Sequence, residues 1–339
     1  MSWKVWVPAA VLLVAVAGGG AWAFGLLPSP SPCRSGTVEV SVAAQPEIAP
    51  ALRDVASRFT VERHRVGGRC VRVRVTAVAP AEFARRSELR RRTDAWAPES
   101  SLWLGIVRDA GDRSVPQGGT SLAVTPVVLA TTRPVAGELA AGHVAMSWKL
   151  LLKSKVDGLG LARKAADPGV GISGMVAMLA LDQVGGETGD VAGDLRRSAP
   201  SPADDAAGGA AAVLAGLTAA ERYDRPLVVT TEQAAIAYND AHRPNPLAPI
   251  VPDEGTLMLD HPYAVTARDR RHRDAAAAFG DALGTRSARD TLQRAGFRAP
   301  DGTFGDARAR EHGLPAAPPK ALRFPTRKEI DRALASWKA

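Results

Sequence analysis

Short apolar segments of strand length alternate with amphipathic helical segments from residue 37 onward. Residues 37–44 alternate apolar and polar side chains, and apolar residues at helical spacing follow them up to Phe59. A second strand pattern begins at Cys70. Strands that alternate with helices form βαβ units, whose strands lie parallel in one sheet. The chain is therefore predicted to be an α/β protein.

Residues 94–103 predict a short buried strand that leads through Pro98 into a helix whose first turn carries Ser100 and Ser101. The first N–H groups of a helix lack internal partners, and together with the helix dipole they attract anions and other acceptors. In open α/β sheets, ligands bind at the carboxyl ends of the strands, where this turn is expected. The two serines are therefore candidate ligand donors, and the alternative is that one of them only caps the helix.

The α/β pattern continues through the rest of the chain. Residues 122–130 predict a strand interrupted by Pro126, which belongs at an edge or a crossover because proline cannot donate to a sheet. Residues 185–210 are rich in Gly, Asp, Ala and Pro and are predicted to form a long exposed loop. Residues 226–230 predict a strand that enters a helix, and residues 259–266 predict another strand.

The N-terminus carries a localisation signal. Residues 5–27 contain no charged side chain, and 23 such residues are enough for a helix to cross about 30 Å of hydrocarbon. The sequence Ala-Trp-Ala at 21–23 also resembles a signal-peptidase site, so a cleaved secretory signal is the alternative. Because the apolar run is longer than a usual signal core, we favour an uncleaved single-pass anchor in the cell membrane. Both interpretations place the remainder outside the cytoplasm.

The chain has two cysteines, Cys33 and Cys70. In an oxidising compartment, two cysteines suggest one disulfide. Cys33 precedes the first predicted strand and Cys70 opens the second, so both sulfurs are expected at the same end of the sheet if those strands are parallel neighbours. We therefore predict a Cys33–Cys70 disulfide and no metal site at these residues.

Charge and motifs exclude several function classes. The formal net charge is +8, but the densest basic run, residues 85–92, has helical spacing and no interleaved aromatic residues, so nucleic-acid binding is not expected. The sequence contains no phosphate-binding glycine loop, zinc-protease motif or serine-hydrolase elbow, and its six histidines lack ligand spacing. We expect a protein without metal or cofactor that is not an enzyme.

Five loops follow strand-like segments in a fixed order, at residues 43–47, 98–101, 167–174 and 230–233 and near Tyr263. Together they resemble the type II periplasmic solute-binding fold, as in molybdate-binding proteins. The resemblance implies two α/β lobes with a ligand held in the cleft between them.

The chain is also similar to the extracellular solute-binding-like domain that precedes a von Willebrand factor type A domain in actinobacterial membrane proteins. This resemblance covers about residues 33–305 and is carried by five motifs, at residues 94–103, 119–129, 232–234, 254–256 and 296–298. The chain departs from it in having Gln45 where such proteins usually place a serine, and in lacking the Asp-x-Ser-x-Ser motif of the von Willebrand domain.

The resemblance implies an organisation in three parts. Residues 1–32 form the anchor or transmembrane helix and a spacer, residues 33–310 the solute-binding-like domain, and residues 311–339 a Pro-rich linker with a C-terminal helix. Within the domain, lobe 1 comprises residues 36–126 and 266–310, and lobe 2 comprises residues 127–265.

The implied ligand site combines hydroxyl groups with N–H groups at helix starts. Its predicted members are Gln45, Ser100, Ser101, Ser121, Ser173, Gly174, Thr231, Glu232 and Tyr263. For Tyr263 and Glu232 the alternatives are a buried structural tyrosine and a helix N-terminal carboxylate.

The first functional hypothesis is an anchored extracellular receptor that captures a small polar or anionic solute, with a transporter or a von Willebrand factor type A protein as a possible partner. The second is a surface interaction or adhesion module that has lost its ligand. A cell-wall enzyme has the least support.

Overall fold

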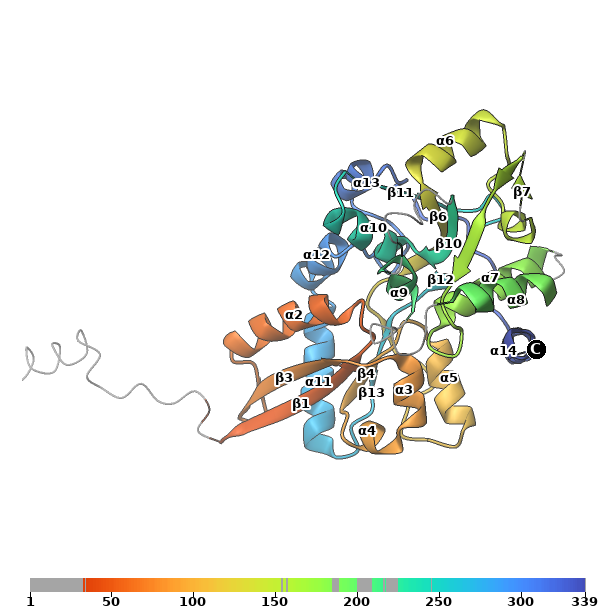
Figure 1. Cartoon of the computed structure of the whole chain (residues 1–339). Coiled ribbons are helices and arrows are strands. Elements are labelled where there is room, and N and C mark those ends of the chain that lie inside the picture. Colours follow the sequence, from red (N-terminus) through yellow and green to blue (C-terminus); the bar gives the residue numbers. More distant parts are fainter. Residues whose placement is uncertain are drawn as a thin grey trace, which may run out of the picture.

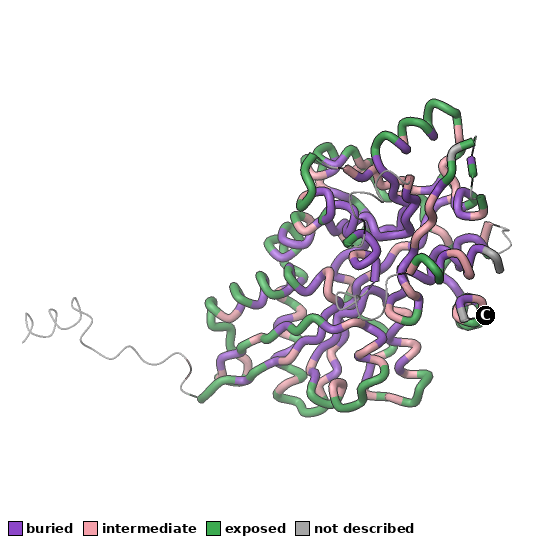
Figure 2. Tube along the Cα trace, viewed as in Figure 1, coloured by how far each residue is buried: buried purple, intermediate pink, exposed green. Residues whose placement is uncertain are grey.

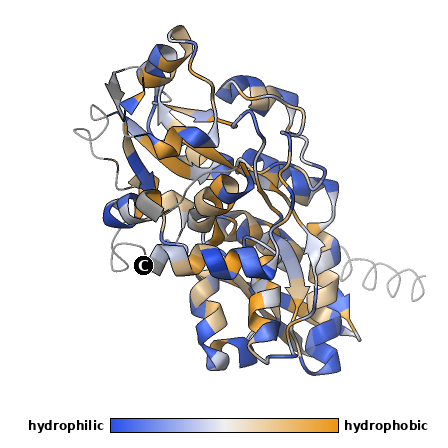
Figure 3. Ribbon diagram, turned by 90° about the vertical axis from the view of Figure 1, so that its right-hand side faces the viewer, coloured by the Kyte–Doolittle hydropathy of each residue, from blue (hydrophilic) through white to orange (hydrophobic). Residues whose placement is uncertain are grey.

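Two lobes of α/β structure make up the protein in the computed structural model (Figure 1). The structure describes residues 33, 35–153, 155–156, 158–184, 189–199, 209–215, 217, 225–244 and 246–338. Buried residues follow the strands through the interior of both lobes, and exposed residues lie on the outer helices (Figure 2). The outer helices alternate polar and apolar stretches (Figure 3), as expected for helices that cover a sheet with one face.

Lobe 1 is built on a six-stranded sheet in the order β2-β3-β1-β4-β13-β5. Its strands are β1 (Thr37–Ala44), β2 (Arg65–Val66), β3 (Arg69–Ala77), β4 (Ala95–Ala97), β5 (Thr120–Ser121) and β13 (Pro262–Val265). β1 has the predicted bounds and lies parallel to both β3 and β4. β13 returns from much later in the chain and pairs antiparallel with β4 and β5.

Helices cover both faces of this sheet. They are α2 (Ala49–Val61), α3 (Pro80–Arg85), α4 (Ser87–Arg91), α5 (Leu102–Asp109), α11 (Arg270–Leu283) and α12 (Arg286–Arg294). α2, α11 and α12 pack on one face, while α3 and α5 pack around Trp96 on the other. The basic run that suggested a single helix is divided, because Arg86 adopts an extended backbone between α3 and α4.

Lobe 2 contains the sheet β11-β6-β10-β9, with β12 also paired to β6, and a separate hairpin β7-β8. The strands are β6 (Thr125–Thr132), β7 (Lys155–Val156), β8 (Leu159–Gly160), β9 (Ala162–Ala165), β10 (Pro226–Thr231), β11 (Leu247–Ile250) and β12 (Met258–Leu259). Every residue of β6 is buried. Pro126 lies at its start opposite Met258, where the chain crosses between the lobes, in agreement with the sequence expectation.

The helices of lobe 2 are α6 (Arg133–Ala141), the 3-10 helix η2 (Trp148–Leu152), α7 (Ile172–Val184), α8 (Gly189–Ser198), α9 (Ala210–Ala215) and α10 (Glu232–Ala241). The expectation of an exposed loop over residues 185–210 is wrong at α8, where Val191, Ala192 and Leu195 enter the core. The high Gly and Asp content hid this amphipathic pattern. Tertiary packing of an apolar face outweighs weak helix propensity.

The C-terminal helices α13 (Asp306–His312) and α14 (Arg327–Lys338) both pack on lobe 2. Ile330, Ala333 and Trp337 of α14 join the same core cluster as α7 and α8. The segment that was predicted as a linker and terminal helix is thus part of the packed structure over its described residues.

A buried ion pair joins lobe 2 to the C-terminal segment. Arg298 and Glu232 are both fully buried, and the guanidinium donates from Nε (2.7 Å) and Nη2 (2.8 Å) to the two carboxylate oxygens. Arg298 also donates to the carbonyl groups of Gly302, Pro315 and Ala317. Its own backbone pairs with Val124, which lies just before β6. One side chain thus links α10, the crossover and the C-terminal segment.

Removing one partner of this pair is expected to destabilise the fold strongly. Arg298→Met leaves the buried Glu232 carboxylate without its cation, and breaking a buried pair costs about 3–5 kcal/mol. Arg289→Met, which alters an exposed arginine on α12, should change stability by less than about 0.5 kcal/mol. Urea unfolding of both variants measures the difference, and equal stabilities would contradict the assigned role of Arg298.

The predicted disulfide is present. Cys33 and Cys70 are bonded, with Cα atoms 5.3 Å apart and a sequence separation of 37 residues. The bond fixes the entry to β1 against the start of β3, as the parallel arrangement required.

Reduction or a Cys33→Ser, Cys70→Ser double substitution should lower the free energy of unfolding by about 3–4 kcal/mol, because a loop of this length gains entropy in the unfolded chain. Urea unfolding in the presence and absence of reductant measures this change. A loss below about 1 kcal/mol would show that the bond does not constrain the unfolded chain in this way.

The predicted membrane anchor, residues 1–32, lies outside the described residues. Within the described ranges, no helix has the length and apolar character needed to cross a bilayer.

Candidate functional site

The carboxyl ends of β1 and β4 lie side by side at one edge of the lobe 1 sheet. Ala44 pairs with Ala97, and the N–H of Gln45 donates to the carbonyl oxygen of Ala97 at 2.9 Å. Gln45 is buried, and its Oε1 accepts from the N–H of Glu47 at 2.9 Å. The segments that follow the two strands therefore leave lobe 1 together, and both contact lobe 2.

Glu99 reaches from the end of β4 to the first turn of α7 in lobe 2. Its Oε1 accepts hydrogen bonds from the N–H of Ile172 and from Nε1 of Trp103, the latter at 3.2 Å. Only 1% of the residue is exposed, and this burial raises the pKa of the carboxyl group against the opposing effect of the two hydrogen bonds. Helix starts attract negative charge. Glu99 therefore occupies a position that an anionic group of a ligand could otherwise take.

A second carboxylate crosses between the lobes from the end of β1. Oε1 of Glu47 accepts from the N–H of Ala211 in α9 at 3.0 Å. Its Oε2 accepts from Nε2 of Gln45 at 2.8 Å, so the predicted site residue Gln45 orients this carboxylate. Lobe 1 thus contacts two helices of lobe 2 through acidic side chains.

Ser173 lies between these two contacts. It is 1% exposed, and within the described part of the chain its Oγ has no hydrogen-bond partner. A Cβ atom placed on Gly209 would lie 3.6 Å from Ser173 Oγ and 3.8 Å from Glu47 Oε1. Ser173 Oγ and Glu47 Oε1 therefore both lie within van der Waals reach of the space that a side chain on Gly209 would occupy. An unsatisfied buried hydroxyl is costly, so it calls for an explanation.

Gly174 permits a close approach instead of offering a ligand donor. A Cβ at this position would lie 2.0 Å from the carbonyl oxygen of Ala166, so only glycine lets the first turn of α7 pack against the segment that follows β9.

The three other predicted serines, in lobe 1 and the crossover, make hydrogen bonds within the protein. Ser100 Oγ accepts from the N–H of Leu102, the first residue of α5, whereas the N-cap residue Ser101 makes no side-chain capping bond. The N–H of Ser101 donates to Oδ1 of Asp260, and Ser121 Oγ donates to the carbonyl oxygen of Asp260, each at 2.8 Å. Ser101 and Ser121 thus meet at the chain segment that enters β13.

Thr231, Glu232 and Tyr263 also have partners within the protein. Thr231 caps α10, because its Oγ1 accepts from the N–H of Ala234. Glu232 binds Arg298, and the Tyr263 hydroxyl donates to the carbonyl oxygen of Ala276 within lobe 1 at 2.9 Å. A ligand contact for these three side chains stays a prediction.

Sequence analysis did not select the two acidic side chains that connect the lobes. Glu47 and Glu99 both lie in loops that the sequence predicted to follow strands, but the predicted site residues in these loops were Gln45, Ser100 and Ser101. Their position directly after buried strands could have identified them, because an acidic side chain there can reach a helix start on the facing lobe.

No basic side chain within the described ranges forms an ion pair with Glu99. His261 lies on the crossover, and its backbone N–H donates to the backbone carbonyl oxygen of Glu99. This imidazole is fully buried against Phe297, and burial lowers its pKa to about 3. It is therefore neutral at physiological pH and supplies no positive charge to the carboxylate.

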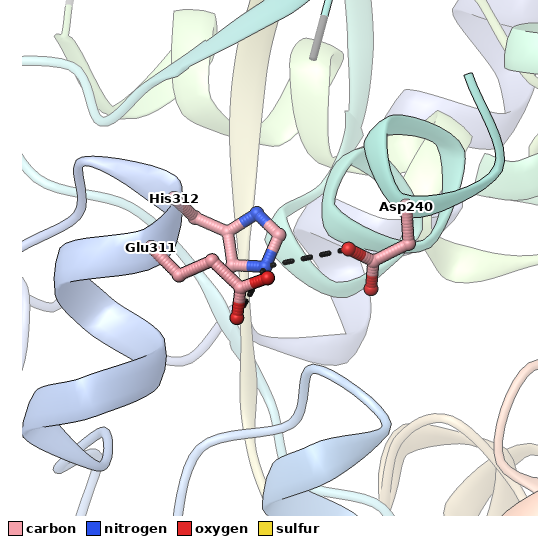
Figure 4. Close-up of side chains that lie close together, drawn as sticks. All are labelled: Asp240, Glu311 and His312. Carbon is pink, nitrogen blue, oxygen red and sulfur yellow. Dashed lines mark ion pairs between the residues drawn. The ribbon is translucent and has the colours of Figure 1, made fainter. Parts of the chain in front are cut away.

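One cluster of acidic and histidine side chains has the composition of a metal site. Glu311 and His312 of α13 point toward Asp240 of α10, with Nε2 of His312 3.7 Å from Oδ1 of Asp240 (Figure 4). Arg308 and Arg243 each bind both Asp240 and Glu311. Because two guanidinium groups already compensate the carboxylates, the cluster is an ion-pair network that fastens α13 to α10.

Solved structures with the same architecture are two-lobed periplasmic binding proteins. The sulfate-binding protein of Mycobacterium tuberculosis H37Rv has a TM-score of 0.54 at 20% identity, covering 83% of this chain and 93% of its own. A periplasmic thiamin-binding protein has a TM-score of 0.60 at 11% identity, covering 89% of this chain and 96% of its own. The binding protein AfuA of Actinobacillus pleuropneumoniae, with bound fructose-6-phosphate, has a TM-score of 0.57 at 14% identity, covering 89% and 97%. These identities establish the fold, which confirms the predicted two-lobe type II architecture.

The family model described as bacterial extracellular solute-binding protein matches residues 40–298. The chain belongs to this family, in agreement with the resemblance found in its sequence. Its members are binding proteins, so the prediction of a non-enzymatic protein is confirmed, and the domain acts in the extracellular or periplasmic space. No curated protein sequence matches the chain.

The raised pKa of Glu99 predicts how stability depends on pH. Burial penalises the charged form in the folded state, so this carboxyl group destabilises the fold increasingly as pH rises from its unfolded pKa through its higher folded pKa. Glu99→Gln keeps an acceptor for Ile172 but does not titrate. The variant should therefore gain stability relative to the wild type between pH 4 and pH 8.

Unfolding free energies of the two proteins across this pH range measure the effect. All other titrating groups cancel in the difference between them, so a difference that stays constant with pH would contradict a raised pKa at Glu99.

Proposed function

We propose that this protein captures a small polar solute between its two lobes and presents it to a membrane transporter. Membership of an extracellular solute-binding family supports the general activity. The observation that supports the site is the hydrogen bond from Ile172 to Glu99, because it brings a strand end of lobe 1 to a helix start of lobe 2. The unpartnered Ser173 hydroxyl and the space beside Gly209 lie at the same junction.

A polar solute fits this site better than a tetrahedral oxyanion. The N–H groups of Ile172 and Ala211 already donate to carboxylates of the protein, so an oxyanion would have to displace Glu99 and Glu47. Gln45 stands where a serine donor is usual in oxyanion-binding relatives, and its amide is engaged by Glu47.

We further propose that residues 1–32 hold the binding domain at the cell membrane, with secretion after signal cleavage as the alternative. The support is the uncharged run of residues 5–27 in the sequence. Anchoring would keep the domain near its transporter, or near a von Willebrand factor type A protein.

Native mass spectrometry of the purified chain, followed by thermal-shift screening against amino acids, amines, sugars and oxyanions, tests solute capture. A ligand at one hundred times its dissociation constant should stabilise the protein by about 2.7 kcal/mol. Ser173→Ala should weaken binding of that ligand about fivefold, since it removes one hydrogen bond worth about 1 kcal/mol, while Ser287→Ala on the exposed side of α12 should not.

One observation favours a second function, the surface interaction module. Glu47 and Glu99 already join the lobes without a ligand, so the fold does not require a solute to bring them together. In that case no member of the screening panel would stabilise the protein, and no small molecule would be retained in native mass spectra.

A further inference from the structure

We propose that the solute carries an ammonium or guanidinium group, and that this cation binds between the Glu99 carboxylate and the Ser173 hydroxyl. The proposal rests on the solute-binding function above and assigns the chemical class of its ligand. Neither the family description nor the similar structures assign these residues.

The first argument is the charge of Glu99. Burying an ionised carboxylate is costly unless a cation or several hydrogen bonds compensate it. Within the described ranges, Oε1 receives two N–H donors, and no arginine, lysine or histidine forms an ion pair with the carboxylate. The other fully buried carboxylate of the interlobe region, Glu232, has a bidentate arginine. Glu99 therefore lacks the cationic partner that Glu232 has in Arg298.

The second argument is the Ser173 hydroxyl, which is independent of the first. Its oxygen is buried and unpartnered, and it borders the space beside Gly209 opposite Glu47. A hydroxyl oxygen accepts hydrogen bonds, and an ammonium or guanidinium group offers several donors from one centre. A single cationic group could therefore pair with the Glu99 carboxylate and donate to the unpartnered Ser173 hydroxyl oxygen together.

The third argument concerns how the ligand is held in place. The N–H of Ile172, the residue directly before Ser173, donates to the Glu99 carboxylate, so the carboxylate and the hydroxyl are both positioned by the first turn of α7. Trp103 fixes the carboxylate from the lobe 1 side. Two acceptors positioned by packed elements cost little reorganisation when a donor group arrives, which favours specific binding.

Thermal-shift and calorimetric titrations of the full-length chain with putrescine, ethanolamine and arginine test the proposal. 1,4-Butanediol and ethylene glycol serve as neutral isosteres of the first two probes, and sulfate and molybdate as anions. At least one cationic probe should raise the melting temperature while its neutral isostere and the anions do not. Its affinity should fall with increasing salt, because charge pairing is screened.

Two variants locate the cation. Glu99→Gln should weaken binding of the active cationic probe at least tenfold, because it removes the negative charge while retaining an acceptor for Ile172. Glu62→Gln, which alters an exposed carboxylate in lobe 1, is the matched control and should bind as the wild type does. Ser173→Ala removes an oxygen that has no partner in the protein, so it should weaken binding without unfolding the chain.

Different results overturn different claims. Stabilisation by sulfate, molybdate or a neutral solute, or cation binding that Glu99→Gln leaves unchanged, would overturn the cationic assignment and leave solute capture standing. If no solute from the panel or from the expression host binds the wild type, both the cationic assignment and solute capture are overturned in favour of the interaction module.

Discussion

The buried ion pair between Arg298 and Glu232 determines how the parts of this protein meet. A guanidinium and a carboxylate without solvent contact are stable only as partners, so α10, the crossover at Val124 and the C-terminal segment must come together at one point. This constraint explains why residues far apart in the chain belong to one structure.

At the junction between the lobes, two carboxylates bind backbone N–H groups. Glu99 and Glu47 extend from neighbouring strand ends and accept N–H groups from helices of the opposite lobe. In binding proteins of this architecture a ligand in the cleft favours the closed state by contacting both lobes. Here the protein supplies two such contacts itself, and the Ser173 hydroxyl is left without a partner in the described residues. Because the N–H groups of Ile172 and Ala211 already donate to these carboxylates, the proposed ligand is a hydrogen-bond donor with positive charge.

The motifs that carried the family resemblance have mainly structural roles. Glu232 and Arg298 form the buried pair. Glu254 accepts hydrogen bonds from the Ser147 hydroxyl and the N–H of Trp148, and the N–H of Thr256 donates to Lys320. A sequence motif can therefore identify a family correctly through residues that maintain the fold. Glu232, a predicted member of the ligand site, pairs with Arg298, and a ligand contact for it stays a prediction.

The sequence by itself determined the α/β class, the bounds of β1 and the disulfide, because strand alternation and cysteine placement are local patterns. It did not reveal α8, whose apolar face is visible only against the core it enters. Only the tertiary structure decided which polar side chains were already satisfied. Ser100 and Tyr263 have partners within the protein whereas Ser173 has none in the described residues, and hydrogen-bond partners far apart in sequence cannot be read from a linear pattern.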